Sequence, residues 1–343
     1  MSAQVLANVI RGETIESVHA GHICVVDGEG KTVAAVGDPS MVTFFRSACK
    51  AFQFIPCLTS GAADAVGFTD EEVALAVASH SGEPRHVEIA ASMLAKGGFA
   101  EADLHCGAHL PFKEAEAHRL IAEGRGPTQL HNNCSGKHAA MLTFAKHIDA
   151  DTSNYESMDN RIQRRILRCI ADFTEVPEDQ IATGIDGCSA PNFALPLDAM
   201  ARSVANLVHP VKFPEVTQAA CGRIVAAMTK YPEVIGGTER LDTLLMQKAQ
   251  GRIVSKVGAD GVWVCGVLPC EQYPTGLGIA VKVADGDDLR ARPVIAVQIL
   301  RELGILGGED LPELCPLPIK NRSGDVVGRI EATQNLTRKG ETR

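Results

Sequence analysis

Residues 252–268, "RIVSKVGADGVWVCGVL", contain two apolar, β-rich runs on either side of Gly258-Ala259-Asp260-Gly261. Two such runs joined by a short glycine-containing turn predict a β-hairpin. Residues 277–286, "LGIAVKVADG", alternate apolar and polar side chains and stop at Asp285-Gly286, which predicts a further strand. This part of the chain is therefore expected to form an antiparallel sheet.

The beginning of the chain shows the same β-rich pattern. Residues 22–39, "HICVVDGEGKTVAAVGDP", have two runs around a turn at Gly28-Glu29-Gly30. Near the other end, residues 320–330, "KNRSGDVVGRI", predict two short strands around Ser323-Gly324. Strands at both ends of the chain favour one sheet to which both ends contribute.

The middle of the chain has a helical pattern. Thr69 stands before three acidic residues, which is typical of a helix start. Residues 158–173 place apolar side chains at spacings of three and four, which predicts an amphipathic helix, and another helix is expected at about 289–303. We therefore predict one discontinuous α+β unit, 1–343, with a sheet part at about 1–40 and 250–343 and a helical part at about 41–249.

Composition excludes several function classes. The net charge of -9 and the lack of a clustered Lys/Arg stripe argue against nucleic acid as a partner. No apolar run approaches the length of a membrane span, and the first residues lack the pattern of a secretory signal, so no membrane partner is expected. Eleven scattered cysteines do not suit a secreted disulfide framework, so a reducing, cytoplasmic location is expected.

A serine and a lysine stand three residues apart in "FFRSACKAF", residues 44–52. On a helix Ser47 and Lys50 would be neighbours, and a neutral lysine amine could then take the serine proton. A buried lysine is costly unless it is paired or neutral, so its position in an apolar run raises the question of its use. The alternative is an ordinary surface lysine on an amphipathic helix.

Two further polar stretches read as pocket-lining loops. Residues 78–86, "ASHSGEPRH", gather hydroxyls and imidazoles after an apolar helix, although polar capping residues would give the same pattern. Residues 131–142, "HNNCSGKHAAML", place small and polar residues before a helix, where backbone N–H groups can face an anion. They do not form a phosphate-binding Walker loop, because His131 stands where the first glycine is required.

Cys134 and Cys188 could be two soft metal ligands, although isolated cysteines are more often small buried hydrophobes. Lys256 lies near the end of a predicted strand and is followed by Gly258. A Ser-x-x-Lys helix followed later by a Lys-x-Gly strand resembles the pattern of serine β-lactamases and penicillin-binding proteins.

Taken together, the motifs resemble the rhizobial-type L-asparaginases, the asparaginase II family. The matching stretches are "RSACK", "HSGE", "HNNCSGKHAAML", "GIDGCSAPNFALP", "GGTERLDTLLM" and "SKVGADGV", in an order and spacing that agree from about residue 10 to 335. The resemblance implies a serine β-lactamase/penicillin-binding-protein-like α+β fold, hydrolysis of L-asparagine to L-aspartate and ammonia, and a homodimer.

The resemblance also implies roles for individual residues. Two Ser-Lys pairs carry the catalysis, Ser47 with Lys50 and Ser79 with Lys256. Zn²⁺ is expected in the pocket on three ligands, Cys134, Lys137 and Cys188, with Asp186 and His138 close by. Substrate contacts are expected from polar residues in the same motifs: Arg46, His80, Glu83, Asn133 and His138. The chain departs from the family at two positions, each directly after an expected site residue. Ala51 stands where the family often has proline, and Ser189 stands where it often has glycine.

Two other functions stay open. A β-lactamase- or peptidase-like serine hydrolase would share the fold and Ser47–Lys50, but those enzymes lack the motif of Cys134, Lys137 and Cys188. A non-catalytic zinc-binding module would make both Ser-Lys pairs incidental. Asparagine hydrolysis is the favoured hypothesis, with the glutaminase side activity and the identity of the acylated serine left open.

Overall fold

The computed structural model describes residues 2–333 and 336–338. The chain divides into two compact units. Unit 1 contains Met1–Ala48, Leu195–His209 and Leu244–Arg343, and unit 2 contains Cys49–Ala194 and Pro210–Thr243. Our expectation that all of 1–343 acts as a single catalytic unit remains a prediction.

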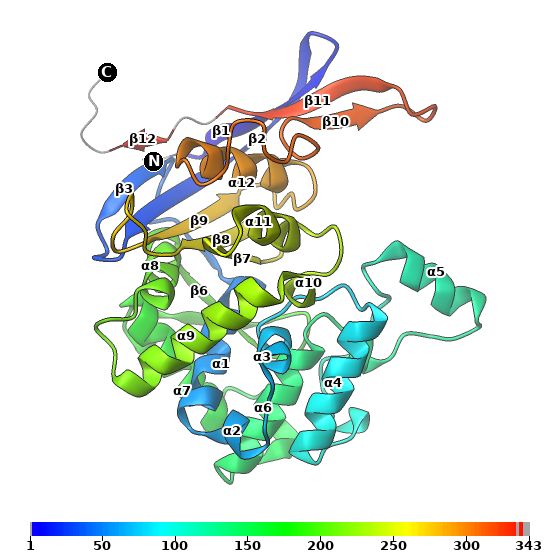
Figure 1. Cartoon of the computed structure of the whole chain (residues 1–343), viewed down its shortest axis with the longest axis vertical. Coiled ribbons are helices and arrows are strands. Elements are labelled where there is room, and N and C mark those ends of the chain that lie inside the picture. Colours follow the sequence, from blue (N-terminus) through cyan, green and yellow to red (C-terminus); the bar gives the residue numbers. More distant parts are fainter. Residues whose placement is uncertain (1, 334–335, 339–343) are drawn as a thin grey trace. The chain divides into compact units, whose positions relative to one another are not determined.

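Unit 1 is built on an antiparallel sheet in the order β10-β11-β1-β2-β9-β8-β7, with β3 paired to β2 and β12 paired to β3. Strands from the two chain ends, blue and red in Figure 1, lie side by side, as β1 pairs with β11. The strands of this sheet are β1 (Gln4–Arg11), β2 (Thr14–Asp27), β3 (Thr32–Val36), β7 (Ile253–Val257), β8 (Val262–Val267), β9 (Leu277–Val283), β10 (Leu317–Lys320), β11 (Val326–Ala332) and β12 (Thr337–Arg338). Strand β4 (Val42–Phe44) is not part of it.

Two helices cover this sheet, α8 (Leu197–Val208) and α12 (Ala291–Glu302). Helix α8 packs on β2, β8 and β9, and α12 packs on β1, β8 and β11. Strands β7 and β8 are buried along their whole length, which explains why their sequences read as nearly continuous apolar runs. The predicted hairpin at 252–268 is confirmed, because β7 and β8 pair antiparallel with Lys256 opposite Val264.

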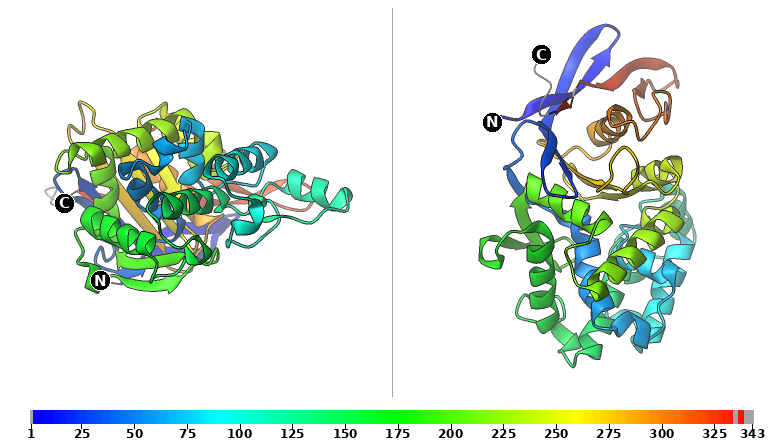
Figure 2. Two further views of the ribbon diagram at one scale, coloured as in Figure 1. Left: turned by 90° about the horizontal axis from the view of Figure 1, so that it is seen from below. Right: turned by 60° about the vertical axis from the view of Figure 1, so that its left-hand side comes forward.

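Unit 2 is mainly helical. Figure 2 shows its helices, coloured from blue to yellow-green, packed against one another. Its elements are α1 (Lys50–Thr59), α2 (Ala62–Ala65), α3 (Asp70–Ala76), α4 (Pro84–Gly97), α5 (Glu114–Ala122), α6 (Ser135–His147), α7 (Arg161–Thr174), β5 (Ala182–Ile185), β6 (Pro191–Pro196), α9 (Glu215–Lys230) and α10 (Pro232–Ile235), with short 3-10 helices between them. Strand β6 and helix α11 (Leu241–Ala249) each begin in unit 2 and continue into unit 1.

Helix α6 is the central helix of unit 2. It packs against α1, α3, α4 and α7, and its residues from Ser135 to Ala145 are all buried. A helix that is surrounded on all sides needs no single apolar face, so α6 shows no strong periodicity in its sequence. Gly136 allows the close approach of α3, because a Cβ atom there would lie 2.4 Å from the carbonyl oxygen of Leu75. The glycine of the 131–142 motif is therefore required by packing.

Several sequence predictions are confirmed by these elements. The structure has the α+β class, with an antiparallel sheet from both chain ends and a helical middle. Thr69 starts α3 with a capping box, in which Glu72 and Thr69 cap each other's backbone N–H groups. The helices expected at 158–173 and 289–303 are α7 and α12. Among the described residues, no helix combines the length and the hydrophobicity that crossing a bilayer requires.

Candidate active site

Lys50 is the first residue of α1, and its side chain is only 1% exposed. Its Nζ lies within hydrogen-bond distance of three oxygens: 2.5 Å from the carbonyl of Ala78, 3.0 Å from Ser79 Oγ and 3.1 Å from the carbonyl of Asn133. In the described part of the chain, no carboxylate pairs with this amine. A lysine in this position can act as an acceptor for the serine proton when it is neutral.

Ser79 lies in the loop that follows α3, and it is 4% exposed. The loop is fixed on its other side, because the backbone N–H of Ser79 donates to the carbonyl of Ile235 at 2.9 Å. The capping box at Thr69 fixes where α3 begins, and the helix ends at Ala76. Ala78 and Ser79 therefore leave the helix with both of their oxygens directed to Lys50.

Ser47 lies in the 3-10 helix η1 (Arg46–Cys49), which leads directly into α1. It is half-buried, and its hydroxyl makes no hydrogen bond to the residues that the structure describes. Ser47 belongs to unit 1, whereas Lys50 belongs to unit 2. Their pairing therefore remains a prediction from their spacing in the chain.

Lys256 is the fourth of the five residues of β7 in unit 1 and is 5% exposed, and its Nζ donates to the carbonyl of Val257 at 3.0 Å. Steric crowding explains the glycine at position 258 of the Lys-x-Gly motif. A Cβ atom at Gly258 would lie 3.0 Å from the carbonyl oxygen of Phe45 and 3.1 Å from Arg46 Cβ. Because Ser79 belongs to unit 2, the predicted pair of Ser79 with Lys256 also remains a prediction.

Arg46, which we expect to contact substrate, makes an ion pair with Asp260 at 3.1 Å. It has a positive φ of 56°, a backbone conformation that residues other than glycine adopt at a cost. Strained backbone is common at functional sites, and here it stands immediately before Ser47. The ion pair connects this residue to the turn between β7 and β8.

The predicted metal ligands meet in unit 2. One ligand atom each from Cys134, Asp186 and Cys188 all lie within 4.8 Å of one another. Lys137 Nζ donates to Cys188 Sγ at 3.0 Å, and Cys188 Sγ lies 3.5 Å from Asp186 Oδ2. Cys134, Lys137 and Cys188 are at most 5% exposed, and Asp186 is half-buried. Residues that are 54 positions apart in the chain therefore form one cluster.

The charges in this cluster are strongly coupled. A hydrogen bond from the Cys134 thiol, helped by the Lys137 ammonium, outweighs burial and lowers the pKa of Cys188 to about 5. The same hydrogen bond, together with burial, raises the pKa of Cys134 to about 12. Burial opposes the charged form of Lys137, but the neighbouring sulfur atoms raise its pKa above the ordinary value. The cluster without metal is thus a thiolate–ammonium pair beside a thiol.

The donor set fits zinc. Thiolate sulfur is a preferred ligand of Zn²⁺, and a neutral amine nitrogen is a suitable further ligand. Ligands at about 2.0–2.3 Å from a tetrahedral ion lie roughly 3.3–3.8 Å apart, which is close to the spacing of these atoms. Asp186 is placed to orient a ligand from the second shell. These residues could hold the ion with little rearrangement.

The other predicted substrate-contact residues are in different situations. His80 is fully buried, and both ring nitrogens are engaged: Nδ1 accepts from Gly82 N at 3.2 Å, and Nε2 lies 2.9 Å from Ser135 Oγ. Burial and the neighbouring His86 hold the pKa of His80 well below its ordinary value. Its observed contacts are those of a neutral residue that connects the loop after α3 to the start of α6.

Glu83 and Asn133 are half-buried. Glu83 Oε1 accepts from both the backbone N–H and the hydroxyl of Thr238, at 2.8 and 3.0 Å. The backbone N–H of Asn133 donates to His109 Nε2 at 3.0 Å, and its carbonyl accepts from Lys50. The backbone of Asn133 therefore takes part in holding the Lys50 amine.

Two functional neighbours were not predicted from the sequence. Asn132 Oδ1 accepts from Cys134 N at 2.8 Å, and its Nδ2 donates to the carbonyl of Cys106 at the same distance. Tyr155 Oη lies 2.7 Å from His138 Nδ1. Asn132 belongs to the 131–142 motif and could have been chosen there. Tyr155 stands in a polar stretch with no motif, so no sequence signal marks it.

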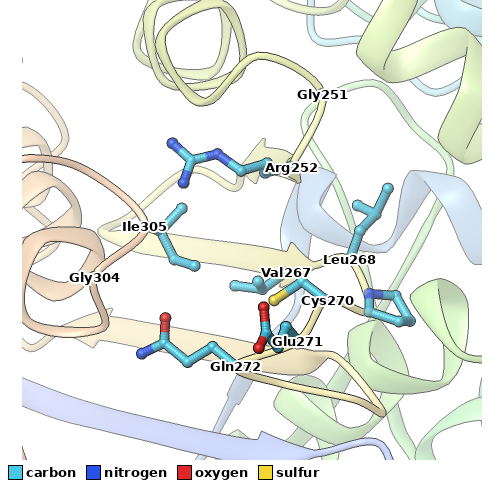
Figure 3. Close-up of a pocket in the computed structure, with 10 residues that line it drawn as sticks. Gly251, Arg252, Val267, Leu268, Cys270, Glu271, Gln272, Gly304 and Ile305 are labelled. Atoms are coloured by element: carbon cyan, nitrogen blue, oxygen red, sulfur yellow. The ribbon is translucent and has the colours of Figure 1, made fainter.

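Unit 1 also has a surface pocket of about 620 Å³. Figure 3 shows the side chains of Arg252, Glu271 and Gln272 at this pocket. The pocket lies at the ends of β7 and β8, and none of the predicted site residues lines it. It therefore shares no residue with either cluster described above.

A lysine amine at hydrogen-bond distance from a serine hydroxyl is the arrangement of a Ser-Lys hydrolase. A family model described as L-asparaginase II matches residues 7–332. The chain belongs to the L-asparaginase II family and is an amidohydrolase, which acts on a small-molecule amide. The comparison with curated proteins found no match.

Three solved structures show the range of similar folds. A probable glutaminase from Bacillus subtilis complexed with 6-diazo-5-oxo-L-norleucine has 14% identity and a TM-score of 0.40, covering 84% of this chain and 85% of that chain. A Bacillus glutaminase in 4.3 M NaCl has 14% identity and a TM-score of 0.40, covering 83% and 91%. A protein called Mglu, also in 4.3 M NaCl, has 16% identity and a TM-score of 0.37, covering 82% and 60%.

Proposed function

We propose that this amidohydrolase converts L-asparagine to L-aspartate and ammonia, using Lys50 as the base. Family membership supports the reaction class. The observation that carries the proposal is the contact of Lys50 Nζ with Ser79 Oγ at 3.0 Å in a buried setting without a carboxylate partner for Lys50. The amine thus lies within proton-transfer distance of a serine hydroxyl, as a general base must.

Ser47 is the proposed nucleophile. It is more exposed than Ser79, and its hydroxyl is free of hydrogen bonds to the described residues. Its oxygen attacks the side-chain amide carbon of asparagine while Lys50 accepts the hydroxyl proton. The C–N bond then breaks, the proton passes to the leaving ammonia, and an aspartyl ester remains on Ser47. Attack by water on this ester releases L-aspartate and restores the serine.

Ser79 and Lys256 have supporting roles in this proposal. Ser79 holds the amine of Lys50 in place through the observed hydrogen bond. Lys256 either passes protons through Ser79 or disfavours protonation of Lys50 by its own positive charge. Arg46, His80, Glu83, Asn133 and His138 are proposed to shape the substrate pocket, and His80 does so through the protein contacts described above.

We also propose a zinc ion bound by Cys134, Lys137 and Cys188, with Asp186 beside it. When bound, zinc supplies a Lewis acid that can hold a carboxylate or amide oxygen of the substrate. The protein residues bring the ligands together and exclude water, since three of the four are nearly completely buried. We expect loss of the ion to weaken substrate binding more than it slows the chemical step.

Ammonia release from L-asparagine tests the reaction directly. L-Glutamine and nitrocefin serve as comparison substrates, because glutamine is one methylene longer and nitrocefin reports β-lactamase activity. One methylene changes selectivity by about 10- to 200-fold in a fitted pocket, so kcat/KM for glutamine should be at least about tenfold lower. Turnover of nitrocefin without turnover of asparagine would contradict the proposal.

The proposal also includes the oligomeric state and the cellular location of the protein. We propose a homodimer, which sedimentation of the purified protein tests. Exposed Ile15, Val18 and Val326 on β2 and β11 are apolar side chains that a partner could cover. A reducing, cytoplasmic location is proposed because all eleven cysteines are free thiols.

A further inference from the structure

His138 is a fully buried residue of α6, one helical turn after Cys134. Its Nδ1 atom lies 2.7 Å from Tyr155 Oη, and the two rings meet edge to face with centroids 5.4 Å apart. Tyr155, which lies before α7, is also 0% exposed. One ring nitrogen of His138 is thus fixed by a residue outside all of the sequence motifs.

The hydrogen bonds of Tyr155 decide which nitrogen of His138 carries the proton. Tyr155 Oη accepts the backbone N–H of His105 at 2.8 Å. A phenol has a single proton to donate, and His138 Nδ1 is the acceptor that the described residues offer for it. Nδ1 therefore accepts, and the neutral imidazole carries its proton on Nε2.

The Nε2–H group of His138 has no hydrogen-bond partner among the described residues, although it is completely buried. His138 directly follows Lys137 in α6, and its backbone N–H donates to the carbonyl of Cys134 at 3.0 Å. It therefore lies beside two of the proposed zinc ligands. A buried donor without a partner is unfavourable, so such a donor is expected to serve a ligand.

We infer that Tyr155 is a positioning residue, which holds His138 in the tautomer whose Nε2–H donates to an acceptor oxygen of the bound substrate. This inference rests on the proposed function for the identity of the substrate. In the inferred complex, His138 Nε2–H donates a hydrogen bond to a carboxylate or carbonyl oxygen of the bound amino-acid substrate before the reaction begins.

The surroundings of Tyr155 support a fixed orientation. The side-chain amide of Gln163 donates to the backbone carbonyl of Tyr155 at 2.8 Å. His105, whose N–H binds the phenol oxygen, is itself paired with Glu156 at 2.9 Å. Both contacts hold the ring where its hydroxyl meets His138. Replacement by phenylalanine keeps the ring and removes only the hydroxyl.

Nitrogen NMR of the protein with ¹⁵N-labelled histidine tests the tautomer without any substrate. The His138 signals are assigned by their loss in His138→Gln. We expect a protonated Nε2 and an unprotonated Nδ1 in the wild type, and a mixture of the two tautomers in Tyr155→Phe. A proton on Nδ1 in the wild-type protein would overturn the inference, and this holds whether or not asparagine is the substrate.

Kinetics provide the second arm of the test. In Tyr155→Phe we expect KM for L-asparagine to rise about tenfold, with a smaller change in kcat, because a ground-state donor is misplaced. Thr143→Val is the matched control, because it also removes a buried hydroxyl. The Thr143 hydroxyl is on α6 and donates to the carbonyl of Ala139 at 3.0 Å. A KM in Tyr155→Phe equal to that of the control would overturn the positioning role.

Discussion

Lys50 Nζ lies 3.0 Å from Ser79 Oγ, although the two residues are 29 positions apart in the chain. The sequence motif pairs Lys50 with Ser47, and the resemblance assigns Ser79 to Lys256. In addition to Ser47, the serine of its sequence motif, Lys50 therefore has Ser79 as a hydrogen-bond partner within unit 2. The two serines need to be separated by experiment, because both are candidates for acylation.

The first prediction separates these serines. Ser47→Ala should lower kcat by about a thousandfold or more, because an activated nucleophile is removed. Ser79→Ala should lower kcat by about 10- to 100-fold, since Lys50 keeps two of its three oxygen contacts. Ammonia release measures both rates, and Ser203→Ala, another fully buried serine, is the control. Retention of a tenth of wild-type activity in Ser47→Ala would reject its assignment.

Local motifs in the sequence were enough to select residues that the structure then brings together, although their chemistry stays a proposal. Cys134 and Cys188 were chosen as soft ligands, and the structure brings both into one cluster with Lys137. The contact of Lys50 with Ser79 could not be predicted, because spacing along a chain shows only which residues are near within one helix. That contact depends on where α3 ends, and the packing of α3 against α6 determines the place of the loop.

The strands of the sheet could be predicted from the sequence, but their pairing could not. Alternating runs at both chain ends indicated its strands, but the pairing of β1 with β11 and of β2 with β9 required the structure. The sequence placed helix α8 in the helical part of the chain, 41–249. In the structure α8 instead packs on the sheet of unit 1. Tyr155 was missed because a tyrosine without a motif has no sequence signal until its hydroxyl is placed.

The second prediction concerns Lys256. Lys256→Met should lower activity and shift the rising limb of the pH profile of kcat/KM, because the proposal gives Lys256 a part in the proton transfer to Lys50. Lys248→Met, which removes an ammonium paired with Asp310, is the control. An unshifted profile at full activity would make Lys256 a strand residue only.

The third prediction is the pH dependence of zinc binding. The pKa of Cys134 is raised to about 12 and that of Lys137 is also raised, so both hold protons at neutral pH in the free site. Zinc must displace these protons, and affinity should therefore increase as pH rises from 6 to 8, by up to about tenfold per unit for each proton released. Titration with a competing chelator at several pH values measures this. An affinity that is independent of pH would contradict the ligand set.

Zinc content provides the control for the same site. Protein purified without chelator should contain close to one zinc per chain, and Cys134→Ser should lose it. Cys221→Ala removes a buried thiol outside the cluster and should keep the metal. Less than about a tenth of a zinc per chain, with no change in Cys134→Ser, would exclude the site.

The fourth prediction concerns Ser189, the residue that directly follows Cys188. Ser189 has a φ of 70°, and its N–H closes a turn onto the carbonyl of Asp186 next to Cys188. This conformation costs about 1 kcal/mol or more for a residue with a Cβ atom, so Ser189→Gly should raise the free energy of unfolding by about that amount. Ser323→Gly, an exposed turn position without positive φ, should be neutral or slightly destabilising in the same denaturation assay.

The most direct test of the central claim is the rate of ammonia release from L-asparagine by Lys50→Met. Methionine fills a similar volume without an amine, so the fold should be kept while the base is lost. We predict a loss of about a thousandfold or more in kcat, with an unchanged melting temperature. Lys146→Met, which removes a lysine that donates to the carbonyl of Gly97 in the same unit, should keep full activity. A folded Lys50→Met enzyme with activity within tenfold of the wild type would contradict the account.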